Sequence, residues 1–152
     1  ITPFNYNLVT PLKSSISASR IFNKIVLIAA EYEIINYSTA KYFTSGFDNE
    51  NNTISSIYKN TSNIKLGGEI NIKPIILRAG YSKFGSPFTE KDFSTENYSY
   101  GIGLNNGNYY VDATYVLSQS AFEQLLYNED YINPIDLKKT NHSFILTLGF
   151  RY

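Results

Sequence analysis

The sequence predicts an all-β fold, an antiparallel transmembrane β-barrel, and three observations favour it. Segments in which apolar and polar residues alternate recur along the chain. The connections between these segments are short and long in turn. The last segment, Asn141–Tyr152, is apolar on one face and ends on an aromatic residue, as the closing strand of a bacterial outer-membrane barrel does.

The C-terminal segment carries the clearest alternation. Neighbouring strand residues point to opposite faces, so Ser143, Thr147, Gly149 and Arg151 share a mostly polar face on which Ile145 is the exception. We interpret the opposite, apolar side chains as a C-terminal signal for barrel assembly: Phe144, Leu146, Leu148, Phe150 and Tyr152. An amphipathic strand over a soluble core would alternate in the same way, so this segment alone does not separate the two folds.

Six further segments alternate similarly and bring the expected number of strands to seven. In chain order they are Ser14–Phe22, Ile25–Tyr37, Asn63–Ile72, Ile75–Ser82, Asn97–Leu104 and Asn108–Ser118. Their expected outward residues are Ile16, Ala18 and Phe22; Ile28, Ala30, Tyr32 and Ile34; Ile64, Leu66, Ile70 and Ile72; Ile75, Leu77, Ala79 and Tyr81; Tyr98, Tyr100, Ile102 and Leu104; Tyr109, Val111, Ala113, Tyr115 and Leu117. Arg20 interrupts the first apolar face, but a long cation near a membrane edge can reach the polar layer.

The connections sort by length. Asn23-Lys24, Lys73-Pro74 and Asn105-Asn106-Gly107 read as tight turns, whereas residues of about 38–62, 83–96 and 119–140 form long polar links. Outer-membrane barrels have short periplasmic turns and long extracellular loops, and compact soluble domains seldom carry three such loops. The sequence therefore favours a membrane barrel over a soluble sandwich and predicts that the three long links are extracellular.

Composition limits the other classes of function. The 152 residues suit one domain or part of one and have a formal net charge of zero without a basic run, so we expect no nucleic-acid partner. Cysteine is absent, which excludes thiolate metal sites. No apolar run approaches the roughly 20 residues of a transmembrane helix. We expect no metal and no cofactor.

The number of strands predicts incompleteness. Single-chain bacterial barrels have even strand counts, and an unpaired edge strand in lipid leaves costly backbone groups without hydrogen bonds. We therefore expect residues 1–152 to be the C-terminal part of a single outer-membrane β-barrel domain of about fourteen strands. The alternative is a seven-stranded barrel closed on itself by pairing of the first and last strands.

Several strings resemble a known family. They are Lys65-Leu66-Gly67-Gly68-Glu69, Leu77-Arg78-Ala79-Gly80-Tyr81 with Phe84-Gly85-Ser86-Pro87-Phe88, Gly107-Asn108-Tyr109-Tyr110-Val111-Asp112, and Leu146-Thr147-Leu148-Gly149-Phe150-Arg151-Tyr152. The chain from about Pro11 is similar to the C-terminal half of FadL/TodX-type outer-membrane transport proteins, in the Bacteroidota branch often labelled hemin receptor.

The resemblance implies passive uptake of hydrophobic small molecules, of the long-chain fatty acid or aromatic hydrocarbon class, across the bacterial outer membrane. The implied partners are the lipid bilayer, the remainder of the barrel and a hydrophobic ligand. The alternative is a non-transporting barrel that serves as a subunit or scaffold for other outer-membrane proteins. We do not expect an enzyme. The single histidine, His142, lies between Asn141 and Ser143, and adjacent strand residues cannot converge into a catalytic triad.

Two sets of inward residues are candidates for function. The charged set, expected to face the lumen, either lines a transport path or forms a structural polar network: Glu31, Glu33, Lys65, Glu69, Arg78, Asp112 and Arg151. If Lys73-Pro74 is a two-residue turn, Glu69 lies opposite Arg78. The inward glycines either leave space for a ligand or plug or relieve crowding where the sheet curves: Gly67, Gly80, Gly101, Gly103 and Gly149.

One long link has helical spacing. In Ser120–Tyr127, Phe122, Leu125 and Leu126 fall on one side of a helix. Such a helix would lie over the barrel mouth, dock a partner or pack locally.

Overall fold

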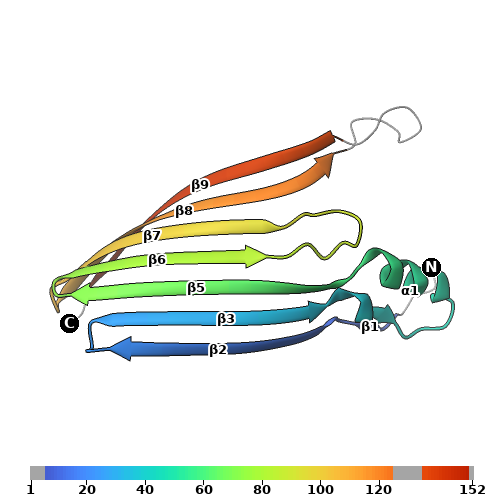
Figure 1. The fold of residues 1–152 in the computed structure, drawn as a ribbon, viewed down its shortest axis with the longest axis horizontal. Helices are drawn as coiled ribbons and strands as arrows, with labels where there is room; N and C mark the ends of the chain where they lie inside the picture. The colour runs from blue at the N-terminus through green and yellow to red at the C-terminus, as the bar shows by residue number, and fades with distance from the viewer. Residues whose placement is uncertain (1–5, 125–134, 151–152) are drawn as a thin grey trace.

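The computed structural model of this chain describes residues 6–124 and 135–150. Seven long strands form one sheet in the order β2-β3-β5-β6-β7-β8-β9, and each strand pairs antiparallel with the next (Figure 1). Their bounds are β2 (Leu12–Phe22), β3 (Val26–Asn36), β5 (Asn60–Ile72), β6 (Ile75–Phe84), β7 (Thr95–Asn105), β8 (Tyr109–Gln124) and β9 (Ile135–Phe150). The predicted antiparallel all-β class and its seven strands are confirmed.

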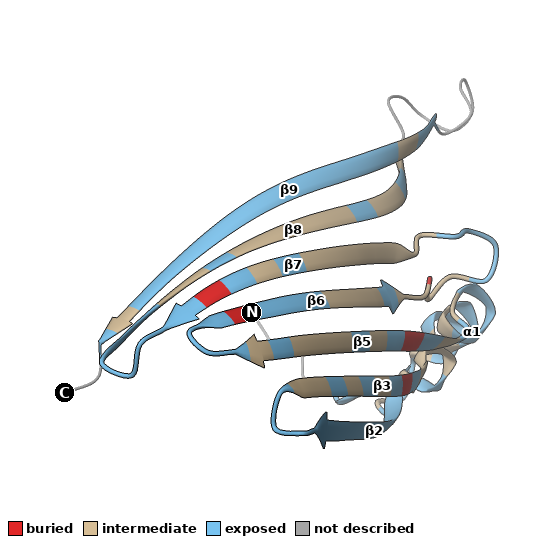
Figure 2. Cartoon of the chain, turned by 60° about the vertical axis from the view of Figure 1, so that its left-hand side comes forward, coloured by how far each residue is buried: buried red, intermediate tan, exposed pale blue. Residues whose placement is uncertain are grey.

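The sheet is open. Strands β2 and β9 form its two edges, and both are exposed along nearly their whole length (Figure 2). They do not pair with each other, so the seven-stranded barrel closed on itself is not formed. Among the described residues no other strand covers either free edge, and these strands alone do not complete a barrel.

The three tight turns lie where the sequence predicts them, but the bounds of two differ by one residue: they span residues 23–25 rather than 23–24, and 106–108 rather than 105–107. Asn23 and Lys24 have φ angles of 49° and 57°, the left-handed conformation of a type I′ turn, which asparagine tolerates best. Ile25 follows as an extra residue, because Phe22 pairs with Val26. Lys73-Pro74 joins Ile72 to its cross-strand partner Ile75. In the third turn, Gly107 has a φ of 86°, which glycine adopts without a steric penalty.

The two ends of the sheet differ as predicted, but the third long link is shorter than the predicted 119–140, because β8 extends to Gln124 and β9 begins at Ile135. Asn23, Pro74 and Asn106 lie at one end, called here the turn end, while Gly46 and Thr89 lie at the other, the loop end (Figure 1). Tyr127, in the third long link and therefore also expected at the loop end, lies outside the described residues.

The loop end has secondary structure of its own. A two-stranded sheet pairs β1 (Leu8–Val9) with β4 (Lys41–Tyr42), and the link before β5 contains η1 (Tyr37–Thr39) and α1 (Asp48–Ile57). Asp48 and Glu50 lie in the first turn of α1, where negative charge complements the helix dipole. In the described ranges no helix is both long and apolar enough to cross a membrane.

The predicted helix over Ser120–Tyr127 is wrong where it can be compared. Residues up to Gln124 continue β8, and Phe122 pairs with Leu137 of β9. The helical spacing of three apolar residues is a local preference, whereas the ladder with β9 supplies backbone hydrogen bonds and cross-strand contacts. Leu125, Leu126 and Tyr127 lie outside the described residues.

The register divides the strands into two faces. Directly paired residues share a face, so Glu31 shares one with Lys65, Glu69 with Arg78, and Gly103 with Asp112. We call this the polar face and the opposite one the apolar face.

The apolar face is exposed. Phe144 is 82% exposed and Phe150 79%, whereas the one buried hydrophobic side chain in the described chain, Ile76, belongs to the polar face. Leu77, Ile70, Leu146 and Leu148 are also exposed. Tyr115 is half-buried because its ring packs between those of His142 and Phe144. Within the described chain, no second sheet covers this face, so these residues do not form a soluble sandwich on their own.

Candidate functional site

Charged side chains of the polar face form ion pairs from strand to strand. Glu31 of β3 accepts a hydrogen bond of 2.8 Å from Lys65 of β5, and Arg78 of β6 donates one of 2.8 Å to Glu69 of β5. The predicted contact between Glu69 and Arg78 is thus confirmed. The pairing follows from the turn at Lys73-Pro74, because a slip by one residue would put the partners on opposite faces.

Glu33 belongs to a third group near the loop end. Its carboxylate lies 2.5 Å from the ammonium of Lys13 and accepts a hydrogen bond of 2.7 Å from the amide of Asn63. Glu33 and Asn63 are both buried, so these bonds offset the loss of water around them. Lys13 was not predicted as a site residue, although it lies two residues before Ser15 and therefore on the same face.

Arg78 links three strands. Its Nη1 donates to Asp112 Oδ1 of β8 at 2.5 Å, so the side chain crosses β7, where its direct partner is Gly101. Gly103, the direct partner of Asp112, also lies beneath this contact. The absence of side chains at these two positions of β7 leaves the path open. One guanidinium thereby bonds to two carboxylates.

Neighbouring side chains crowd four of the five predicted glycines of the polar face. A Cβ at Gly80 would lie 2.6 Å from Ser99 Oγ, and one at Gly101 would lie 3.3 Å from Thr114 Oγ1. A Cβ would also collide with Asp112 Oδ1 at Gly103 and with the ring of Tyr110 at Gly149. Neighbouring side chains therefore occupy the space above these glycines. Gly67 differs, because no atom lies within 4 Å of its would-be Cβ.

A hollow of about 360 Å³ lies on the sheet where Gly67 and Gly80 pair. Ala29 and Ser99 extend the row of small residues on either side, and Glu69 and Arg78 border it. The polar face here has open space for a ligand or a packed segment.

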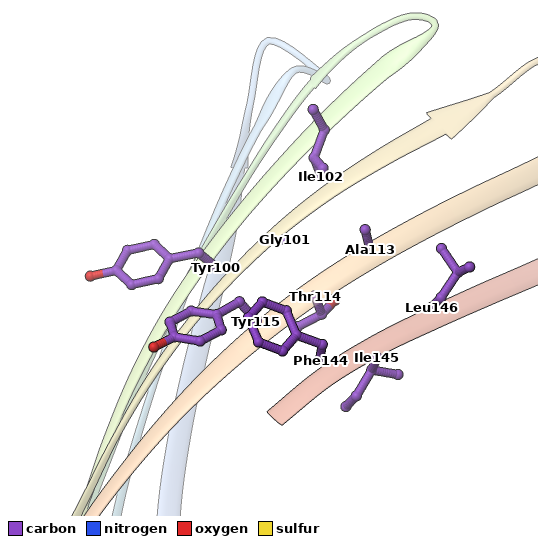
Figure 3. A pocket seen from close by; sticks show the side chains of 9 residues that line it. All are labelled: Tyr100, Gly101, Ile102, Ala113, Thr114, Tyr115, Phe144, Ile145 and Leu146. Carbon is purple, nitrogen blue, oxygen red and sulfur yellow. The ribbon is translucent and has the colours of Figure 1, made fainter. Parts of the chain in front are cut away.

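A second hollow, of about 480 Å³, lies over β7, β8 and β9 and is lined mainly by side chains of the apolar face. Ala113 is its floor, because this small side chain pairs with Ile102 on one side and Leu146 on the other. The next row supplies the rings of Tyr100, Tyr115 and Phe144 (Figure 3). Aromatic and branched walls around a methyl group give a surface suited to apolar molecules.

The two links at the loop end pack against each other. The backbone N–H of Lys59 donates to Pro87 O at 2.8 Å, and that of Thr89 donates to Ile57 O at 2.8 Å. Phe88 contacts the rings of Tyr58 and Phe93, with centroids 5.2 and 5.4 Å away. The sequence predicts loops here but not the contact between them. The one feature of the sequence that indicates such a contact is the presence of aromatic residues in an otherwise polar link.

Asn51 fastens α1 to the small sheet. Its Oδ1 accepts a hydrogen bond from Tyr42 N at 2.8 Å and its Nδ2 donates one to Tyr42 O at 3.0 Å. The side-chain amide thus bonds to Tyr42 as the backbone of a neighbouring strand would. Tyr42 also stacks on Phe47, with ring centroids 4.6 Å apart. The loop end is therefore held by specific polar and aromatic contacts.

His142 does not meet the two polar residues beside it in the sequence. Its Nδ1 lies 2.7 Å from Tyr115 Oη on the apolar face, whereas Asn141 and Ser143 belong to the polar face. In the same ranges no group of three or more potential metal ligands occurs. Of the predicted site residues, Arg151 and Tyr152 lie outside the described chain.

Comparisons of this chain with protein-family models, with curated proteins and with solved structures found no match.

Proposed function

We propose that this chain is part of an outer-membrane β-barrel whose apolar face contacts lipid and whose polar face lines the lumen. The support comes from the exposure of long apolar side chains along every strand of the sheet, from Ile16 of β2 to Phe144 of β9. Exposure of such an apolar surface to water costs about 25 cal/mol for each Å². Contact with lipid removes this cost. The ion pairs of the opposite face suit a polar barrel interior.

The lengths and ends of the strands agree with this proposal. The strands have 10 to 16 residues, and a tilted transmembrane strand needs about 9–11. The turn end would face the periplasm, and α1 with its neighbouring links would lie outside the cell.

For the whole barrel we propose passive uptake of hydrophobic small molecules, such as long-chain fatty acids or aromatic hydrocarbons. The observation that carries this proposal is the hollow over Ala113, which opens on the face that we assign to lipid. An engineered apolar cavity of roughly 150 Å³ can hold benzene, so a hollow of about 480 Å³ has room for a ring or part of an acyl chain.

The test is uptake by cells that lack the gene and are complemented with variants. Ala113→Phe fills the hollow and should lower uptake of labelled oleate or naphthalene severalfold without lowering the amount of protein in the outer membrane. Ile28→Phe is the matched control, because Ile28 is exposed on the same face of β3, away from the hollow. Equal uptake by the two variants and the unchanged protein would reject the hollow as part of the route.

A second function, a non-transporting subunit or scaffold of an outer-membrane assembly, is favoured by a different observation. Arg78 and its carboxylate partners occupy the space over β7, and the loop end is an ordered surface rather than a set of open links. Deletion of the gene would then leave uptake of both probes unchanged and would instead lower the outer-membrane content of a partner protein.

A further inference from the structure

The free edges of the sheet run in the same direction. Strand β2 runs from the loop end at Leu12 to the turn end at Phe22, and β9 runs from Ile135 to Phe150 in the same sense (Figure 1). This follows from an odd number of strands, each antiparallel to the next. In lipid, the unpaired backbone groups of both edges need partners.

A second copy of this chain does not provide suitable partners. A copy placed beside the first with its loops on the same side would pair its β2 with β9 in a parallel sense, whereas bacterial outer-membrane barrels are antiparallel throughout. A copy turned upside down would allow antiparallel pairing of β9 with β9. It would, however, carry the polar helix α1 and its neighbouring links to the turn end and span the membrane in the opposite orientation.

Resting on the proposed membrane location, we propose that β2 and β9 pair with an odd number of strands supplied by polypeptide outside residues 1–152. Both flanking strands run from the turn end to the loop end. An odd number is required because only then do both junctions become antiparallel and the total become even.

The side chains of the two edges indicate the chemistry of the flanking strands. On the polar face, β2 presents Ser15, Ser17 and Ser19, so the strand beside it has room for larger inward side chains. On the same face of β9, Lys139 is exposed and forms no ion pair with another described residue. The strand beside β9 should therefore carry an inward carboxylate near Lys139, since opposite charges across a strand pair are favourable.

Photo-cross-linking in the native membrane tests this pairing. A benzophenone amino acid replaces Asn141, Ser143 or Thr147, three residues on the polar face of β9, and each adduct is identified by mass spectrometry. We expect peptides from outside residues 1–152, with partner residue numbers that fall as the β9 position rises from 141 to 147. A falling order is the signature of an antiparallel neighbour. The same residue at Ser99 of β7 is the positive control and should give adducts near Gly80 or Val116.

Three results would overturn the proposal: adducts to residues 12–22 or 135–150 of a second copy, a rising order of partner residues, or no adducts from β9 while Ser99 reacts. The proposed function fails separately. If the protein is recovered in the soluble fraction but the cross-links show the falling order, the membrane location is wrong and the pairing stands.

Discussion

Arg78 of β6 reaches Asp112 of β8 across the whole width of β7, with 2.5 Å between Nη1 and Oδ1. Its Nε is bonded at the same time to Glu69 of β5, so one side chain connects three strands, β5, β6 and β8, on the polar face. The connection depends on Gly101 and Gly103 of β7, which have no side chains that would block it.

Removal of this guanidinium should destabilise the sheet more than loss of an ordinary exposed ion pair. Arg78→Met leaves the carboxylates of Glu69 and Asp112 without their shared partner, and we expect the free energy of unfolding to fall by roughly 1.5–3 kcal/mol. Lys83→Met, which breaks the pair of Lys83 with Glu96 near the loop end, should have a smaller effect, because an exposed ion pair contributes little to stability. Urea unfolding in detergent micelles measures both, and equal losses would contradict the bridging role.

The lack of a side chain at Gly103, beneath the contact of Arg78 with Asp112, gives a second prediction. A Cβ at Gly103 would collide with Asp112 Oδ1 and lie 3.4 Å from Arg78 Nη1, so Gly103→Ala should destabilise by about 1–3 kcal/mol, as overpacking does. Gly67→Ala is the control, because nothing lies within 4 Å of its Cβ position. It should be neutral or stabilise by about 0.5–1 kcal/mol, since alanine orders a strand at a lower entropic cost. The same ranking is expected in thermal unfolding, and a Gly67→Ala protein that is the less stable of the two would refute it.

The assignment of the faces predicts opposite effects at adjacent positions of β9. Leu146→Arg puts a cation on the apolar face and should cost about 2–4 kcal/mol in lipid. Thr147→Arg puts the same cation on the polar face and should be tolerated. Folding into lipid vesicles, followed by tryptic resistance, compares them, and failure of Thr147→Arg with tolerance of Leu146→Arg would reverse the assignment.

We expect the loop end to open locally without a change in the stability of the seven-stranded sheet. Asn51→Ala removes both bonds to the backbone of Tyr42, so amide hydrogen exchange should rise in residues 41–57 and stay unchanged in β6 and β7. Asn52→Ala, at an exposed position on the same helix, should leave exchange unaltered. Faster exchange throughout the sheet in Asn51→Ala would show that the loop end supports the whole fold.

The strands, faces and turns could be predicted because each depends on short-range pattern. Alternation assigns Glu69 and Arg78 to one face, and the two-residue turn between their strands sets them opposite each other. The pairing of Arg78 with Asp112 could not be predicted this way, because it spans two strands and needs the glycines between them.

The two elements that the sequence does not predict, helix α1 and the extension of β8, share a different cause. Helix α1 has few apolar residues, with Phe47 rather than a polar residue as its N-cap, so its sequence lacks the usual start signal. Its position follows from contacts with distant segments, such as that of Asn51 with Tyr42. The extension of β8 through Phe122 likewise depends on its distant partner Leu137, and local spacing favoured a helix there.

The central claim is that the apolar face contacts lipid and the polar face contacts water inside a barrel. Single cysteines at positions 143 to 148 of β9, introduced into a chain that has none, allow a spin label to report its surroundings in native membranes. Accessibility to oxygen, which concentrates in lipid, should peak at Phe144, Leu146 and Leu148, and accessibility to a water-soluble nickel complex should peak at Ser143, Ile145 and Thr147. Oxygen accessibility without this period of two, or higher at Ser143 and Thr147 than at Phe144 and Leu146, would contradict the account.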